Sequence, residues 1–270
     1  MRDLEPEPLF FALAMIGLGI MTLLYGDFAV IWQPVAKDIP WRQGLACVSG
    51  AALLLGGIGL FFRRTATASA LGLAIYLLIA WVLPQAVKVV PAGTDFIGRW
   101  LGFCETLAVL CGAWLLYYPL PGAGGTVIEG GNAVRAARFL FGASCVLFGL
   151  SHFMYADFTA SMIPSWLPMR LPLAYLTGAG HLAAGVAILF GLLPRLGATL
   201  EAIMMSSFVL LVHLPALFAE PAPAWAPTGR IQWTAMFWAG ALAASAWIVA
   251  RSLRDRPWGK SAMPAGAAGR

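Results

Sequence analysis

Three histidines and one glutamate lie inside long apolar runs, where an ionisable side chain is costly to bury. His152, His181 and His213 are the three histidines of the chain, and each falls in a different apolar run, as does Glu105. Ionisable groups in hydrocarbon are costly unless they are paired, which makes them candidates for function. Facing one cavity, the four could bind a metal ion, relay a proton or hold the polar head of a ligand.

A helical rise of about 1.5 Å per residue places His152, His213 and Glu105 in the outer half of a membrane and His181 near its middle. Glu201 comes early in its run, near the opposite face, so we expect its side chain to snorkel toward the headgroups. The ordinary alternative for a single membrane histidine is a hydrogen bond to a carbonyl or hydroxyl of a neighbouring helix. No HxxxH or ExxH spacing supports metal ligation, and we assign no metal ligands.

The elements that must position these residues are membrane-spanning helices. Charged residues make up 11% of the chain and hydrophobic residues 60%, whereas soluble domains average about 25% charged residues. The apolar runs are continuous, without the period of a strand, and each can cross about 30 Å of hydrocarbon as a helix. We predict an all-α polytopic protein with eight transmembrane helices at about 9–25, 43–62, 69–90, 100–119, 138–155, 171–193, 197–218 and 231–250.

Basic residues are distributed unequally between the connecting segments. With both termini inside, eleven of the 17 lysines and arginines fall in inner segments and six in outer ones. This bias predicts a multi-pass protein of a bacterial inner (plasma) membrane with both termini in the cytoplasm. The lipid bilayer is therefore the expected partner, and no nucleic acid is expected. The basic stretch 251–260 could also contact anionic lipid.

The two halves of the chain resemble each other. Matches in the same order pair Asp27 with Asp157, Pro34 with Pro164, Pro40 with Pro168, Arg42 with Arg170, Gly57 with Gly185 and Arg99 with Arg230. We predict a tandem duplication, with a first four-span unit at 1–119, a cytoplasmic linker at 120–137, a second unit at 138–250 and a basic cytoplasmic tail at 251–270. Because four spans return the chain to its starting face, the units would be parallel repeats.

Each predicted unit has an acidic, aromatic and proline-rich segment on its outer face. Proline disfavours helix in these segments, so we expect a folded-back cap between spans, formed in the second unit by Asp157, Pro164, Trp166, Pro168 and Arg170. We expect Trp32, Trp41 and Trp166 at headgroup depth. Asp27 and Asp157 either cap helix ends or pair with Arg42 and Arg170.

The predicted repeat also indicates where the site lies. The positions that correspond to His152, His181 and His213 in the first unit are Thr22, Leu53 and Val82, and none of these is ionisable. We therefore predict one asymmetric site in the second unit, with Glu105 contributed from the first.

These motifs resemble the DoxX-like membrane proteins. The family's usual four-span unit has a Gly-x-x-His-Phe step, an Ile-Pro-x-x-Leu-Pro loop, a Ser-Gly-x-x-Glu start to the next span and a later Pro-Ala pair. The corresponding residues here are Gly149, His152 and Phe153; Ile163, Pro164, Leu167 and Pro168; Thr177, Gly178 and His181; and Pro215 and Ala216. The resemblance covers 138–250 well and 9–119 weakly. One departure is that the family's glutamate is His181 here.

The resemblance implies a link to redox chemistry, since the family name is tied to a subunit of a thiosulfate:quinone oxidoreductase and to other membrane redox partners. On this basis we predict a redox-associated subunit that binds a quinone or similar lipid-soluble ligand in the outer half of the second unit. Its partner would be a soluble or membrane redox protein. No redox cofactor motif or catalytic residue is evident in the sequence. A small-molecule or lipid transporter and a non-catalytic membrane scaffold remain open alternatives.

Overall fold

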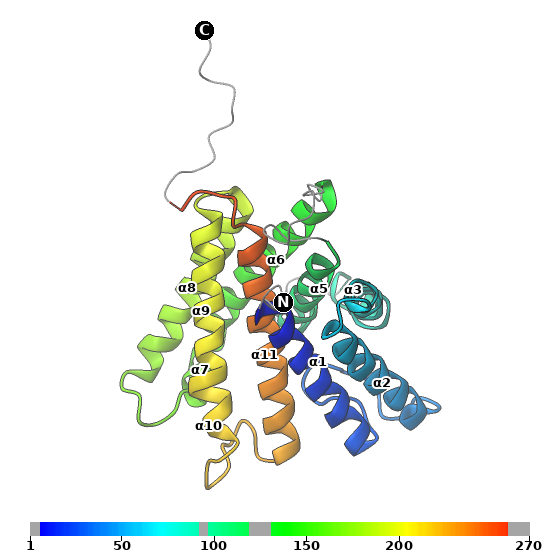
Figure 1. Cartoon of the computed structure of the whole chain (residues 1–270). Coiled ribbons are helices and arrows are strands. Elements are labelled where there is room, and N and C mark those ends of the chain that lie inside the picture. The colour runs from blue at the N-terminus through cyan, green and yellow to red at the C-terminus, as the bar shows by residue number, and fades with distance from the viewer. Residues whose placement is uncertain (1–5, 92–96, 119–130, 259–270) are drawn as a thin grey trace.

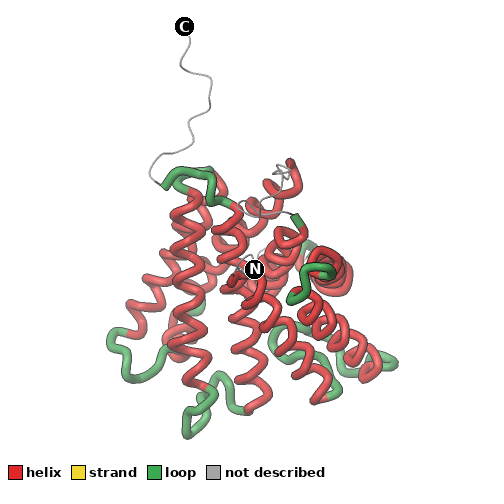
Figure 2. Tube along the Cα trace, in the orientation of Figure 1, coloured by secondary structure: helices red, strands yellow, loops and turns green. Residues whose placement is uncertain are grey.

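The chain folds into a bundle of long helices (Figures 1 and 2). The computed structural model describes residues 6–91, 97–118 and 131–258, and this part of the chain contains no strand. Within it, eight helical segments are long and apolar enough to cross a membrane. The predicted all-α polytopic fold with eight transmembrane helices is therefore confirmed.

The eight spans overlap the eight predicted runs. Six are single helices: α1 (Pro6–Tyr25), α2 (Arg42–Leu60), α5 (Ile97–Tyr117), α6 (Gly131–Met154), α8 (Arg170–Phe190) and α11 (Gly229–Ser252). The third span consists of α3 (Ala66–Tyr76), η1 (Leu77–Val82) and α4 (Leu83–Val89). The seventh consists of α9 (Pro194–Phe208), η2 (Val209–His213) and α10 (Leu214–Ala216), and the short helix α7 (Ala156–Met162) precedes α8.

The third and seventh spans each widen into a π-helical turn just before a proline. The turn η1 precedes Pro84, and η2 precedes Pro215. A proline has no N–H and its ring crowds the carbonyl four residues earlier, so a wider turn lets the helix continue past it. His213 is the last residue of η2, and its placement therefore depends on this turn.

The helices pack as a closed ring in which α5 and α11 also touch across the middle. The order around the ring is α1, α2, α3, α5, α6, α8, α9 and α11, which returns to α1. Figure 1 shows α11 between α9 and α1. The first four helices of this order can be exchanged with the last four. Each contact between neighbours then coincides with another such contact, and the contact between α5 and α11 coincides with itself. This symmetry supports the duplication, which stays a prediction; most of the linker and of the tail lies outside the described residues.

Glycines permit the closest helix contacts in both halves. At the crossing of α6 and α8, a Cβ on Gly149 would lie 2.7 Å from the carbonyl oxygen of Gly178. At the crossing of α1 and α2, a Cβ on Gly19 would lie 2.8 Å from the carbonyl oxygen of Gly50. Such contacts leave no room for a side chain, so small residues set the distance between these helices.

An ion pair anchors the loop between α1 and α2. The side chain of Arg42 lies 2.7 Å from Asp27, which is one of the two alternatives given for Asp27, and Arg230 at the start of α11 lies 3.5 Å from the same carboxylate. Partial burial alone would raise the pKa of Asp27. The backbone N–H of Phe28 and the two arginines outweigh burial and hold the pKa of Asp27 below its ordinary value of 3.8.

The corresponding segment of the second half is built differently. Asp157 is exposed in the first turn of α7, and an ion pair with Arg170, one of the two alternatives for this residue, is not formed within the described part of the chain. Pro164, Trp166 and Pro168 lie in the connection between α7 and α8, where the Trp166 side chain is 63% exposed. This segment therefore folds back through a short helix and not through a charge pair.

Trp32 corrects our expectation that the loop tryptophans lie at headgroup depth. It is 2% exposed, and its ring stacks on Trp238 of α11 with centroids 4.4 Å apart and planes 7° from parallel. Stacking and burial of a large ring outweigh an interfacial position here. Trp41, in contrast, is 87% exposed.

We predict that Gly149→Ala disturbs the contact between α6 and α8. Its Cβ would meet the Gly178 carbonyl oxygen at 2.7 Å and Leu182 Cγ at 2.6 Å, so the backbone must shift. Overpacking of this kind costs about 1–3 kcal/mol, seen as a lower Tm in detergent. Gly72→Ala is the control, because nothing lies within 4 Å of a Cβ at that α3 position. A Gly149→Ala Tm at or above that of the wild type would contradict this packing.

We also predict that Asp27 contributes stability that depends on pH. Its folded pKa is lowered, so its contribution is complete above the unfolded pKa and disappears as the pH falls through the folded pKa. Asp27→Asn should therefore cost up to about 1 kcal/mol near neutral pH, and the difference from wild type should vanish in acid. Thermal unfolding over pH measures this. The exposed Asp38→Asn in the same loop should show no such trend.

Candidate functional site

One cavity of about 490 Å³ is lined by all four ionisable residues that the sequence singled out, His152, His181, His213 and Glu105. Its walls come from α5, α6, α8, α9, η2 and α11, with α7 and Ile31 of the α1–α2 loop at one side. The cavity therefore lies toward the end of the bundle where these connecting segments fold, which we call the loop end. The structure brings the four side chains together, while their roles stay predictions.

His152 contacts two residues of α8 through its Nδ1 atom. Its Nδ1 lies 3.0 Å from the Thr177 hydroxyl and 3.3 Å from the carbonyl oxygen of Ala174. The Thr177 hydroxyl donates its own proton to the carbonyl of Leu173 or Ala174, and a carbonyl can only accept. With the Thr177 proton on one of these carbonyls, Nδ1 is the donor in both contacts, which leaves the lone pair of a neutral ring on Nε2.

His181 forms a buried pair with Glu201, and this corrects our expectation that Glu201 snorkels. The distance from His181 Nδ1 to Glu201 Oε1 is 2.8 Å, and each residue is 1% exposed. A carboxylate with a partner inside the bundle has no need to reach the headgroups. One proton lies in this hydrogen bond, and the His181 ring meets that of His152 edge to face at 4.9 Å.

His213 has an unsatisfied polar atom. Its Nδ1 is buried, and no described residue forms a hydrogen bond with it. The ring packs edge to face against Trp225, with centroids 5.5 Å apart. A buried polar atom without a partner costs about 1–3 kcal/mol. The site therefore has a polar atom that a ligand or water molecule in the cavity would satisfy.

Glu105 is held by a tryptophan of α11, which in turn stacks on a second tryptophan. Trp238 of α11 donates a hydrogen bond from Nε1 to Glu105 Oε2 over 3.0 Å. Trp238 in turn stacks on Trp32, which the α1–α2 loop carries into the bundle. The first half of the chain thus supplies both a carboxylate of the site and the ring that supports its partner.

Most of the remaining lining is aromatic or apolar, including Phe148, Tyr155, Phe158, Met205, Phe208, Trp225 and Leu242. A few fixed polar groups within apolar walls are typical of sites for small organic molecules, and such pockets measure about 300–1,000 Å³. The cavity thus offers a few polar groups within apolar walls, which suits a flat organic molecule with a polar head.

The lining suits a metal ion poorly. No group of three His, Cys, Asp or Glu side chains within the described ranges is placed to hold one. His152 and His181 already use Nδ1 for Thr177 and Glu201. Hydrogen bonding to an organic ligand fits these residues better.

The predicted first half has a neutral polar cluster instead of histidines. Ser49, which the repeat pairs with Thr177, lies 2.6 Å from the Tyr76 hydroxyl and 3.1 Å from the side-chain nitrogen of Gln33. No residue of this cluster lines the cavity. This cluster is therefore separate from the cavity, and the asymmetry of the site stays a prediction.

The loop candidates do not line the cavity. This holds for Asp27, Asp157, Pro164, Trp166, Pro168 and Arg170. Three residues of α7 do line it, namely Phe158, Thr159 and Met162. The loop residues can thus affect the site only indirectly, by positioning α7 and the α1–α2 loop, which do line it.

Three residues were not recognised from the sequence as partners of the site: Thr177, Glu201 and Trp238. Glu201 was noted as an ionisable residue within a span, but its place early in the span assigned it to the headgroups. Thr177 precedes His181 by four residues and thus shares a helix face with it. Trp238 carries no such signal, because its role depends on how α11 is rotated against α5.

Residues 133–214 match the protein family described as DoxX. The matched segment runs from α6 through η2 and includes His152, His181, Glu201 and His213. The match ends at residue 214 and does not include α11, whereas we expected the resemblance to extend over 138–250. No curated protein and no solved structure matches the chain.

We predict that His181 and Glu201 are energetically coupled. Glu201→Leu should lower stability by about 3 kcal/mol, because it leaves a buried polar ring without its partner. The double variant His181→Phe, Glu201→Leu should lose less than the two single variants together. Thermal unfolding of the four proteins gives the coupling. His213→Phe combined with Glu201→Leu is the control, and its losses should simply add. Additivity in both pairs would show that the 2.8 Å contact has no energetic role.

Proposed function

We propose that this protein, whose second half is a DoxX-family domain in a multi-pass membrane protein, binds the head of a quinol or quinone in the cavity and acts as a redox-associated membrane subunit. The observation that carries the proposal is the gathering of three imidazoles and one carboxylate in one aromatic-lined cavity. The position of the cavity between spans suits a ligand that arrives from the lipid phase.

The polar groups favour the reduced form of such a ligand. His152 presents a lone pair on Nε2 because its Nδ1 donates to Thr177 or Ala174. Glu105 already accepts one hydrogen bond from Trp238, and its carboxylate can accept further hydrogen bonds. A quinol carries two O–H donors whereas a quinone carries only acceptors, so acceptors in the site match the quinol.

The pair of His181 and Glu201 provides a route for a proton. Oxidation of a quinol releases two electrons and two protons, and the electrons would pass to a redox partner. One proton would be taken up at His181 Nε2 while the proton of its Nδ1 hydrogen bond moves to Glu201 Oε1. The second would be taken up by the Nε2 lone pair of His152. The His181 imidazole thus moves charge away from the cavity without moving itself.

The distribution of basic residues indicates which side of the membrane the cavity would face. Arg135, Arg138, Arg195, Arg251 and Arg254 lie at the end of the bundle opposite the cavity, where α6, α9 and α11 have their termini. By the positive-inside rule this end faces the cytoplasm. The cavity would then open toward the outer half of a bacterial inner membrane.

A transporter is the second candidate, and one observation favours it. The cavity wall includes Gly98, Leu101 and Glu105 of α5, so both predicted halves line it. Transporters built from parallel repeats bind their substrates between such halves. Substrate-dependent flux into liposomes containing the pure protein would favour this alternative.

The test is equilibrium binding of a short-chain benzoquinone analogue to the protein in mild detergent, with the analogue reduced or oxidised. We expect the reduced form to bind more tightly. His152→Phe should weaken its binding about tenfold, the loss of about one hydrogen bond. Glu105→Gln should weaken it as well, since the amide exchanges an acceptor for a donor.

Tyr76→Phe is the matched control, because Tyr76 is a partly buried polar residue that does not line the cavity. It should bind the analogue like the wild type. Failure of both redox forms to bind, or an equal loss in Tyr76→Phe, would reject the quinol site.

A further inference from the structure

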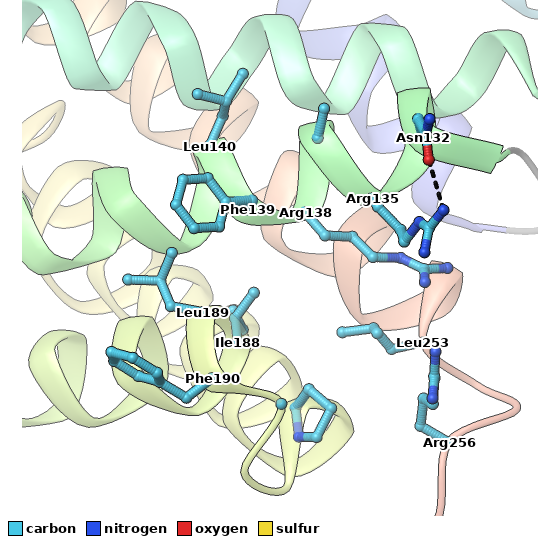
Figure 3. A pocket seen from close by; sticks show the side chains of 13 residues that line it. Asn132, Arg135, Arg138, Phe139, Leu140, Ile188, Leu189, Phe190, Leu253 and Arg256 are labelled. Atoms are coloured by element: carbon cyan, nitrogen blue, oxygen red, sulfur yellow. Dashed lines mark hydrogen bonds between the residues drawn. The ribbon is translucent and has the colours of Figure 1, made fainter. Parts of the chain in front are cut away.

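A second cavity lies at the opposite end of the bundle, between α6, α8 and the segment that follows α11. Its volume is about 660 Å³, which exceeds that of the histidine-lined cavity. Figure 3 shows three arginines around it, Arg135 and Arg138 from α6 and Arg256 from the segment after α11. No residue lines both cavities.

The arginines are positioned by contacts with their own surroundings. Arg138 donates from Nε to the Ser252 hydroxyl over 3.0 Å and from a terminal nitrogen to the Ser252 carbonyl. Arg135 donates to the side-chain oxygen of Asn132, the dashed line in Figure 3. The backbone carbonyl of Arg256 accepts a hydrogen bond from Arg195. Their place at the cavity is therefore built into the fold.

The cavity carries an excess of positive charge. Arg256 lies close enough to Arg138 to repel it, and Asp255 is the carboxylate that partly offsets this repulsion. Three guanidinium groups against one carboxylate leave an excess of two positive charges. Like charges held together cost free energy, which an anion between them recovers.

The other side of the cavity is apolar and continues onto the outer face of the bundle. Phe139, Leu189 and Phe190 lie there, as Figure 3 shows. Phe139 is 57% exposed and Phe190 is 73% exposed. On a membrane-spanning bundle such faces meet hydrocarbon. The cavity thus joins a cationic end at the membrane surface to an apolar end in the membrane.

We propose that this cavity binds one anionic glycerophospholipid. Its phosphate would lie between Arg135, Arg138 and Arg256, where guanidinium groups can make paired hydrogen bonds to phosphate oxygens. An acyl chain would lie against Phe139 and Phe190. Basic pockets between transmembrane helices on the cytoplasmic side bind lipid head groups in this way. A free phosphate would make the contacts with the arginines but not those with Phe139 and Phe190.

The test is a titration of the full-length protein in neutral detergent with phosphatidylglycerol or phosphatidylcholine, followed by native mass spectrometry. We expect phosphatidylglycerol to bind more tightly. The double variant Arg135→Gln, Arg256→Gln should weaken it about thirtyfold, which is about 2 kcal/mol at about 1 kcal/mol per arginine. Arg138 is left unchanged because its bonds to Ser252 support the fold.

The matched control is Arg63→Gln, Arg64→Gln, which removes two exposed arginines from the same end of the bundle but outside the cavity. It should bind phosphatidylglycerol like the wild type. An equal loss in both double variants would show general attraction of anionic lipid and reject the site. Equal binding of the two lipids by the wild type would also reject it.

Phe190→Ser separates a lipid from a free anion. It should weaken phosphatidylglycerol about tenfold, because part of a phenylalanine surface is lost to the acyl chain. It should leave the binding of inorganic phosphate unchanged. Unchanged lipid binding in Phe190→Ser, with competition by inorganic phosphate, would identify a phosphate site and overturn the lipid assignment.

Discussion

Hydrocarbon offers no hydrogen-bond partner, so a polar side chain within a span of this protein is costly unless it finds one inside the bundle. His152 finds Thr177, His181 finds Glu201, and Glu105 finds Trp238. Each bond joins two different helices, α6 with α8, α8 with α9, and α5 with α11. The contacts that remove the cost of these groups therefore also hold the walls of the cavity in place.

Close packing at the glycines complements these bonds. A Cβ on Gly178 would lie 2.8 Å from the Cβ of His152, so the glycine makes room for the histidine against α8. The close approach of α6 and α8 thus depends on the small size of the residues at their crossing.

The fold could be predicted from the sequence because eight apolar runs leave little choice of structure in a membrane. The candidate site could be predicted because His152, His181, His213 and Glu105 are rare ionisable residues within those runs. Their partners could not, since helix rotation depends on contacts between residues far apart in the chain. Trp32 shows the same limit: amphipathic tryptophan suits either the headgroups or the core, and stacking on Trp238 decides for the core.

The departure at position 181 has a structural explanation. The family resemblance places a glutamate there, and this chain has a histidine instead. The structure supplies a carboxylate from the next helix, since Glu201 lies 2.8 Å from the His181 ring. An imidazole now stands between that carboxylate and the cavity, and it can exchange a proton at each of its two nitrogens. The chain therefore has an imidazole and a carboxylate in series at the place where the resemblance has one carboxylate.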